Sequence, residues 1–173
     1  MKRLLRNYLS LLILFMCAVA DVFPQTSATG HVIAEIIPVF TATETSQLNF
    51  GRFAPGPEGG KIILNPQGSV SVLGSVYKGT GMHNAACFYV TGDQDASFSI
   101  TLPDKPVILK HLNSPKTMIV DEWVSIPAPG AGTGSLQNGS QTVYVGATLN
   151  VGTLHDNPAG IYSGTYEISF DFN

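Results

Sequence analysis

The C-terminal ten residues, 164–173, alternate strictly between apolar and polar side chains. The apolar parity carries Tyr166, Ile168, Phe170 and Phe172, and the polar parity carries Thr165, Glu167, Ser169 and Asp171. Such alternation predicts a β-strand with one buried face and one face in solvent. No residue follows Asn173 in this sequence, so we expect the chain to end within a sheet. A strand in that position needs a partner on each side or stands at an edge.

Residues 1–20 have the pattern of a secretory signal peptide. Lys2, Arg3 and Arg6 precede an apolar run from Leu9 to Val19, and small residues at 18–20 suit the cleavage position. The run is short for a membrane span, so the sequence predicts export to the periplasm, the cell surface or the medium. The rival interpretation is a lipoprotein signal with Cys17 lipidated, which the large Met16 disfavours.

Charge limits the partners of the exported chain. Three of the nine Lys and Arg residues lie in the signal, so cleavage after Ala20 leaves six of them against twelve Asp and Glu. A net charge of −6 argues against a nucleic-acid partner and against a polybasic hold on a membrane. We expect no transmembrane segment after the signal is removed. Cys87 is then the remaining cysteine, and its apolar setting favours a buried side chain over a reactive thiol.

Beyond the signal, short apolar runs divided by Gly, Pro, Asn and Asp predict an all-β fold, an immunoglobulin-like β-sandwich. We expect a flexible segment over 21–29 and one sandwich domain over 30–173. Candidate strands lie at 30–39, 47–53, 61–64, 69–76, 86–91, 97–102, 107–112, 117–124, 142–151 and from 161 onward.

Turn residues suggest how these strands connect. The stretch 65–68 predicts a hairpin between 61–64 and 69–76, and 92–95 predicts a second hairpin between 86–91 and 97–102. The Pro- and Gly-rich stretch 55–60 reads as a turn cluster, and 127–134 reads as a flexible loop.

Several motifs resemble an uncharacterised family of secreted bacterial domains that is similar to spore coat protein U and to the pilin subunits of chaperone–usher fimbriae. They are Leu48-Asn49-Phe50-Gly51, the stretches 88–92 and 96–103, 118–121, 145–149 and the ending Gly160-Ile161-Tyr162-Ser163-Gly164-Thr165-Tyr166. The resemblance covers nearly all of residues 26–173. It implies an immunoglobulin-like sandwich and a role in surface fibres or adhesion.

In such pilins the sandwich is incomplete, and an N-terminal segment of one subunit fills the groove of the next by β-strand addition. The resemblance implies that residues 29–37 are this donor segment, with Val32, Ala34 and Ile36 facing the groove. It also implies copies of the chain or related subunits, and a periplasmic chaperone, as partners. The usual pilins carry a disulfide, which the exported chain cannot form. The alternative stays open that residues 30–37 are the first strand of a self-complete domain, because a period of two does not say whose groove a strand fills.

Candidate chemistry is sparse. The four histidines, His31, His83, His111 and His155, lack the short spacing of a zinc site. Asp93 and Asp95 are explained by turn formation better than by calcium binding. Asp121 and Glu122 are adjacent, so on a regular strand they would point to opposite faces and could not act as a carboxylate pair. We therefore predict no catalytic residues, no metal and no cofactor, and a protein that is not an enzyme.

Trp123 is the candidate surface-binding residue. By parity it shares a face with Ile119 and Asp121, where it could stack on a sugar or a partner, although burial in the core is the commoner fate of a large aromatic. Two functions follow. The first is a non-enzymatic exported fibre subunit or adhesin. The alternative is a self-contained binding module, for example for glycans, that uses loops such as 127–140.

Overall fold

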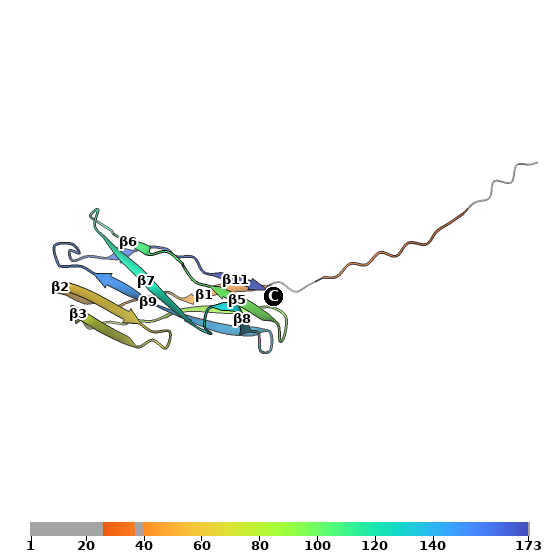
Figure 1. Ribbon diagram of the computed structural model, residues 1–173, viewed down its shortest axis with the longest axis horizontal. Coiled ribbons are helices and arrows are strands. Elements are labelled where there is room, and N and C mark those ends of the chain that lie inside the picture. Colours follow the sequence, from red (N-terminus) through yellow and green to blue (C-terminus); the bar gives the residue numbers. More distant parts are fainter. Residues whose placement is uncertain (1–25, 37–39, 173) are drawn as a thin grey trace, which may run out of the picture. The chain divides into compact units, whose positions relative to one another are not determined.

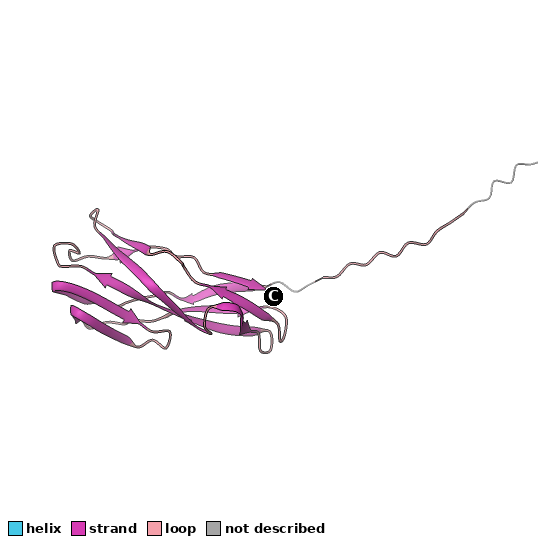
Figure 2. Cartoon of the chain, in the orientation of Figure 1, coloured by secondary structure: helices cyan, strands magenta, loops and turns pink. Residues whose placement is uncertain are grey.

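The computed structural model describes residues 26–36 and 40–172, which belong to two separate units. The second unit consists of strands and the loops that join them (Figure 2), which confirms the prediction of an all-β sandwich. No helix in the described ranges is long and apolar enough to cross a membrane. The predicted signal peptide and the Cys17 alternative lie outside the described residues, as do 37–39 and Asn173.

The strands follow one another along residues 41–172. They are β1 (Thr41–Ser46), β2 (Phe53–Leu64), β3 (Val70–Lys78), β4 (Ala86–Thr91), β5 (Ser97–Thr101), β6 (Val107–His111), β7 (Thr117–Ile126), β8 (Gly130–Ser135), β9 (Ser140–Val151), β10 (Tyr162–Ser163) and β11 (Ser169–Phe172). All of the strand pairs are antiparallel.

Two sheets of unequal size form the sandwich (Figure 1). The larger sheet has the order β1-β4-β9-β7-β6-β10, and the smaller has the order β11-β5-β8. β9 is the organising strand, because it pairs with β7 along one side and with β4 and then β2 along the other. Gly146 lies where β4 gives way to β2, and a side chain there would overlap the backbone of Leu64 and Asn65. The close approach of the two strands therefore requires glycine at this position.

The turn residues at 65–68 correctly predict which two strands pair. β2 and β3 form the predicted hairpin, and Asn65 accepts a backbone hydrogen bond from Gly68 in the intervening turn at 2.8 Å. β9 keeps the predicted parity, with one face fully buried. Its buried apolar residues are Val143, Val145, Ala147, Leu149 and Val151.

The predicted hairpin between residues 86–91 and 97–102 is wrong. β4 lies in the larger sheet, whereas β5 lies in the smaller one. The connection at 92–95 crosses between the sheets, and its backbone bonds to a distant turn: Gly92 N–H donates to Gly139 O at 3.0 Å and Asp95 N–H to Leu136 O at 2.8 Å. Turn residues permit a reversal of the chain, but they do not specify which strand comes next in the sheet.

Two other segments expected to be turns or loops are strands. Residues 55–60 lie inside β2, where the register with β3 shifts between Pro55 and Gly59 and Gly59 has φ +70°. Residues 130–135 form β8, whose Gly134 opposes Phe98 on β5. A side chain at Gly134 would overlap the Phe98 ring, so glycine there makes room for the aromatic side chain.

The interior contains two hydrophobic clusters, named here for later use. The aliphatic cluster consists of Ile62, Val76, Met118, Val120, Ala147, Leu149 and Val151. The phenylalanine cluster consists of Ala86, Val90, Phe98, Ile100, Leu136, Val143 and Val145, with the half-buried Phe88 and Phe170 and with Phe40 packed against it. The smaller sheet supplies Phe98 and Ile100, so it covers the phenylalanine cluster and not the aliphatic one.

Candidate functional site

A groove of about 1110 Å³ opens over the aliphatic cluster. Met118, Val120 and Leu149 of that cluster line the groove, whereas no buried residue of the phenylalanine cluster does. Half-buried apolar side chains from β6, from the loop after β1 and from the first residue of β2 continue its wall. They are Val107, Leu109, Leu48, Phe50 and Phe53. The groove therefore lies where the larger sheet has no second sheet packed against it.

Two chain segments flank this groove, and each has an edge without a ladder partner. β1 pairs with β4 alone among the strands of the described residues. Residues 164–168 pass from β10 in the larger sheet to β11 in the smaller one and are in neither strand. Their side chains still alternate, since Tyr166 and Ile168 are half-buried while Thr165 and Glu167 are exposed. The predicted alternation is thus confirmed from Thr165 to Phe170, whereas Phe172 is 46% exposed and the regular strand is confined to Ser169–Phe172.

A bulge in β7 decides where Trp123 lies. From Asp121 to Val124 the chain advances three residues, while the paired β9 residues advance two, from Thr148 to Gly146. Glu122 has φ +50° at this bulge. The extra residue reverses the parity of the strand, so Trp123 faces inward with Val120 and lines the groove.

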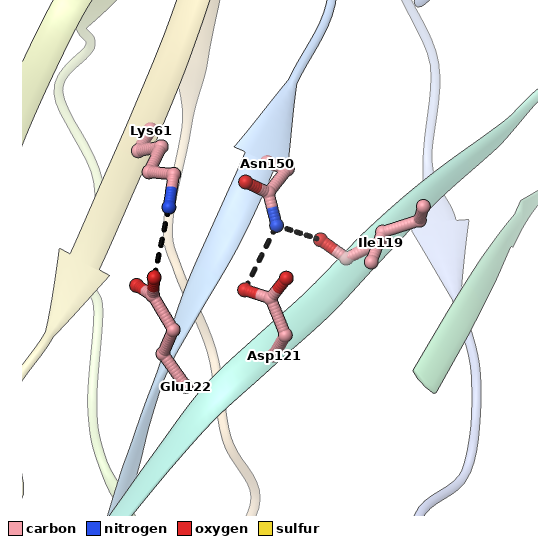
Figure 3. Close-up of polar contacts among 5 residues, drawn as sticks. All are labelled: Lys61, Ile119, Asp121, Glu122 and Asn150. Carbon is pink, nitrogen blue, oxygen red and sulfur yellow. Dashed lines mark hydrogen bonds and ion pairs between the residues drawn. The ribbon is translucent and has the colours of Figure 1, made fainter. Parts of the chain in front are cut away.

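The same bulge places Asp121 and Glu122 on one face, and the prediction of opposite faces is wrong (Figure 3). Glu122 pairs with Lys61 at 2.9 Å, and Asp121 accepts a hydrogen bond from Asn150 Nδ2 at 2.9 Å. The hydrogen bond with Lys61 lowers the pKa of Glu122, and the same bond raises the pKa of Lys61. Both carboxylates are engaged in contacts between strands, and these contacts account for their position on one face.

Trp123 occupies the junction between the two clusters, since it packs against both. Its ring centroid is 4.7 Å from that of Tyr166, and the two planes are inclined by 34°. Trp123 Nε1 is buried and has no hydrogen-bond partner in the described part of the chain. The Tyr166 hydroxyl donates to Glu44 Oε1 at 3.4 Å, which joins the two segments that flank the groove. Burial raises the pKa of Tyr166, and the nearby Glu44 carboxylate raises this pKa further.

The opposite end of the groove is walled by the loop that follows β9. Asn157 is buried and fastens this loop, donating to Thr117 O at 2.8 Å and accepting from Gly152 N–H at 2.6 Å. The Tyr162 hydroxyl donates to Pro158 O at 2.9 Å, and the His111 ring packs edge-on against Tyr162 at 4.9 Å. This end is therefore held by short hydrogen bonds of 2.6–2.9 Å, whereas Tyr166 in residues 164–168 makes a longer one of 3.4 Å.

The described part of the candidate donor segment, residues 29–36, lies in the first unit. Residues 26–36 contain no strand, so a strand beginning at Gly30 is not observed up to Ile36, and the first strand of the sandwich is β1. Val32 and Ile36 are 95% and 96% exposed, and Ile33 is 90% exposed. Ala34 lies between them in the same irregular stretch and is exposed too. These exposures are far above those of apolar residues in the sandwich core.

The remaining candidates lie in separate places. Cys87 is half-buried in β4 and free, and Asp95 has φ +61° in the turn after that strand. His111 belongs to β6 and His83 to the segment before β4. No group of three or more His, Cys, Asp or Glu side chains converges within 26–36 and 40–172. Sequence reasoning missed the groove itself, although the inward parity of Tyr166 and Ile168 was a usable signal for one of its walls.

Comparison with known proteins adds one family match. The model of a domain of unknown function, DUF4402, matches residues 40–172. The chain belongs to this family. The matched region coincides with the sandwich from Phe40 to the end of β11, so groove and both clusters are features of the DUF4402 domain. The donor segment at 29–37 precedes it. No curated protein matches the chain.

Proposed function

We propose that this protein is a non-enzymatic, exported structural or adhesion protein, a pilin-like subunit that assembles by strand donation. Residues 29–37 of one copy fill the groove of a neighbouring copy or a related subunit. The observation that carries the proposal is the apolar groove of about 1110 Å³ in the half of the sandwich that the smaller sheet leaves uncovered. Small-molecule pockets measure about 300–1,000 Å³, so the size of the groove suits a peptide segment at least as well as a small ligand.

The donor segment matches the groove in its pattern. Val32, Ala34 and Ile36 share one parity, so an extended segment presents all three to the same side. Val32 and Ile36 are almost fully exposed in the isolated chain, which leaves apolar surface to be buried. The opposite parity includes His31 and Glu35, which suit a solvent-facing side.

The flanking segments offer backbone for strand addition. An added strand needs an edge whose N–H and C=O groups are not already used in a ladder. β1 and residues 164–168 both supply such an edge, and both contribute side chains to the lining of the groove. The resemblance to pilins and to spore coat protein U supports the same conclusion, as does the predicted signal peptide. A periplasmic chaperone that covers the groove before assembly fits this scheme.

The test starts with intact cells that export the full chain. They are sheared, and the released fraction is separated on an SDS gel without boiling. We expect a ladder of bands that collapses to one band on boiling, because strand-exchanged polymers resist SDS at ambient temperature. A single monomer band from well-expressed protein would contradict the proposal.

A pair of matched variants makes this test specific. The double substitution Val32→Asp with Ile36→Asp places two carboxylates on the groove-facing parity, and we expect the ladder to disappear because buried unpaired charges are strongly disfavoured. His31→Asp with Ile33→Asp adds two carboxylates on the other parity, and the ladder should persist. Loss of the ladder in both pairs would argue against the assigned parity.

A second candidate function is a self-contained binding module that takes a glycan in the groove. The observation favouring it is the stacked pair Trp123 and Tyr166, since aromatic faces recur in sugar sites. Trp123 is the single tryptophan of the chain, so its emission reports on this place alone. A monomer whose Trp123 emission shifts with one member of a glycan panel would favour this candidate. Unchanged emission across the panel would count against it.

A further inference from the structure

The indole N–H of Trp123 is a buried hydrogen-bond donor without an acceptor among the residues that the structure describes. Buried donors are nearly always paired, and leaving one unpaired costs its full desolvation. Because Trp123 lines the groove, an acceptor belonging to the groove's occupant would remove this cost.

Tyr166 covers Trp123 but is weakly held. Its ring stacks on the indole at 4.7 Å, and it lies in the stretch 164–168 that belongs to no strand. Its hydroxyl reaches Glu44 at 3.4 Å, well beyond the 2.7–2.8 Å typical of O–H···O bonds. This contact crosses from one flanking segment to the other, so a strand lying between them has to displace it. The loop at the far end of the groove, by contrast, is fastened by Asn157 at 2.6 and 2.8 Å.

We propose that Trp123 is the positioning residue of the groove: its indole N–H donates to a main-chain carbonyl of the inserted 29–37 segment of a second copy, after Tyr166 has moved aside. The chain's own apolar segment suits this role, because its described residues, 29–36, are exposed and belong to no strand. A main-chain acceptor recurs at every residue of an extended segment, so one fixed donor sets the register of the segment in the groove. This inference rests on the proposed function.

The test measures the affinity of a synthetic peptide with the sequence of residues 29–37. The peptide is added to the full chain carrying Val32→Asp and Ile36→Asp, called the parent chain, in which these substitutions prevent the chain's own donor segment from occupying a groove. Binding is followed by the fluorescence anisotropy of a dye on the peptide. Replacing Trp123 by Phe keeps an aromatic ring and removes the N–H. We expect Trp123→Phe to weaken binding about fivefold to tenfold, the effect of one hydrogen bond. Tyr144→Phe, which removes a hydroxyl from the outer face of β9, is the matched control and should bind like the parent chain.

An ester scan of the peptide separates hydrogen bonding from packing. Replacing one backbone amide at a time by an ester makes the preceding carbonyl a poorer acceptor. One position should carry a penalty in the parent chain that vanishes in Trp123→Phe. If no ester position weakens binding to the parent chain more than the others do, the proposal is overturned. This outcome can be read even if Trp123→Phe does not fold. Tyr166→Phe removes the contact with Glu44 and should bind at least as tightly as the parent; weaker binding would overturn the role of Tyr166 as a displaceable cover.

The outcomes distinguish this inference from the function on which it rests. Peptide that binds the parent and Trp123→Phe equally overturns the role of Trp123 and leaves strand donation standing. Peptide that does not bind the parent chain at all overturns both.

Discussion

The two halves of the sandwich each contain a buried apolar cluster, but the two clusters are covered differently. The phenylalanine cluster lies between both sheets, with Phe98 fully buried and ringed by Phe40 and Phe170 at 5.9 and 6.1 Å. The aliphatic cluster lies on the larger sheet and is bounded on its other side by loops and a groove. Both sheets enclose the core in one half, whereas in the other half a groove leaves it open, so we expect stability to depend on the first half and binding on the second.

The largest expected difference is in the response to truncation. Phe98→Ala should cost about 3–5 kcal/mol of unfolding free energy, because it leaves a cavity that both sheets enclose. Leu109→Ala, on the half-buried groove wall, should cost less than half as much, since solvent already reaches the site. Urea denaturation measures both. Equal losses would show that the two halves are packed alike.

Filling the groove should stabilise the open half alone. With the 29–37 peptide at about 100 times its dissociation constant, unfolding free energy should rise by about 2.7 kcal/mol. In native-state hydrogen exchange, amides of β1 and of residues 164–168, which supply the edges for the added strand, should then be protected, whereas those of β8 should change little. Equal protection of amides in both sheets would contradict a difference between the two halves.

Gly134→Ala tests the tightness of the closed half. The added methyl group would overlap the Phe98 ring, and such overpacking costs about 1–3 kcal/mol. Gly30→Ala is the control, since no atom lies within 4 Å of the position a side chain would occupy there. A thermal melt of the two variants decides. Similar midpoints for both would mean that β8 moves away from β5 at little cost.

The smallest effect concerns the outer face, which both halves share. The pKa of Glu122 is lowered by its bond with Lys61, so the pair stabilises the fold above the carboxyl's unfolded pKa and loses this effect as the pH falls through the folded pKa. Glu122→Gln should therefore lower stability slightly at neutral pH and make no difference in acid. Exposed pairs are weak and screened by salt, so the loss should fade at high ionic strength. Glu58 on β2 is exposed as well, so Glu58→Gln is the charge-matched control in urea titrations at several pH values. An equal loss of stability in the two variants would show that net charge, and not the pair with Lys61, causes the loss.

Features that depend on residues close together in the chain were predictable from the sequence, whereas features that depend on distant residues were not. The β2–β3 hairpin and the buried face of β9 were predictable because a turn of four residues and a period of two are local properties. The separation of β4 from β5 was not, because the turn at 92–95 bonds to residues 136–139, which no local pattern connects with it. Residues 55–60 and 130–135 became strands despite their Gly and Pro content, because neighbouring strands supplied the ladder.

The buried face of β9 and the alternation after Gly164 could be read from the sequence alone, which also marked Val32, Ala34, Ile36 and Trp123 as residues of interest. The sheet that each strand joins, and the face on which Trp123 lies, became known from the tertiary structure. One extra residue at the Asp121–Val124 bulge reversed the parity of β7 and turned the indole into the groove. Alternation is a property of neighbouring residues and is therefore visible in the sequence. Strand partners, bulges and the groove depend on hydrogen bonds between residues far apart in the chain, and no local pattern reveals them.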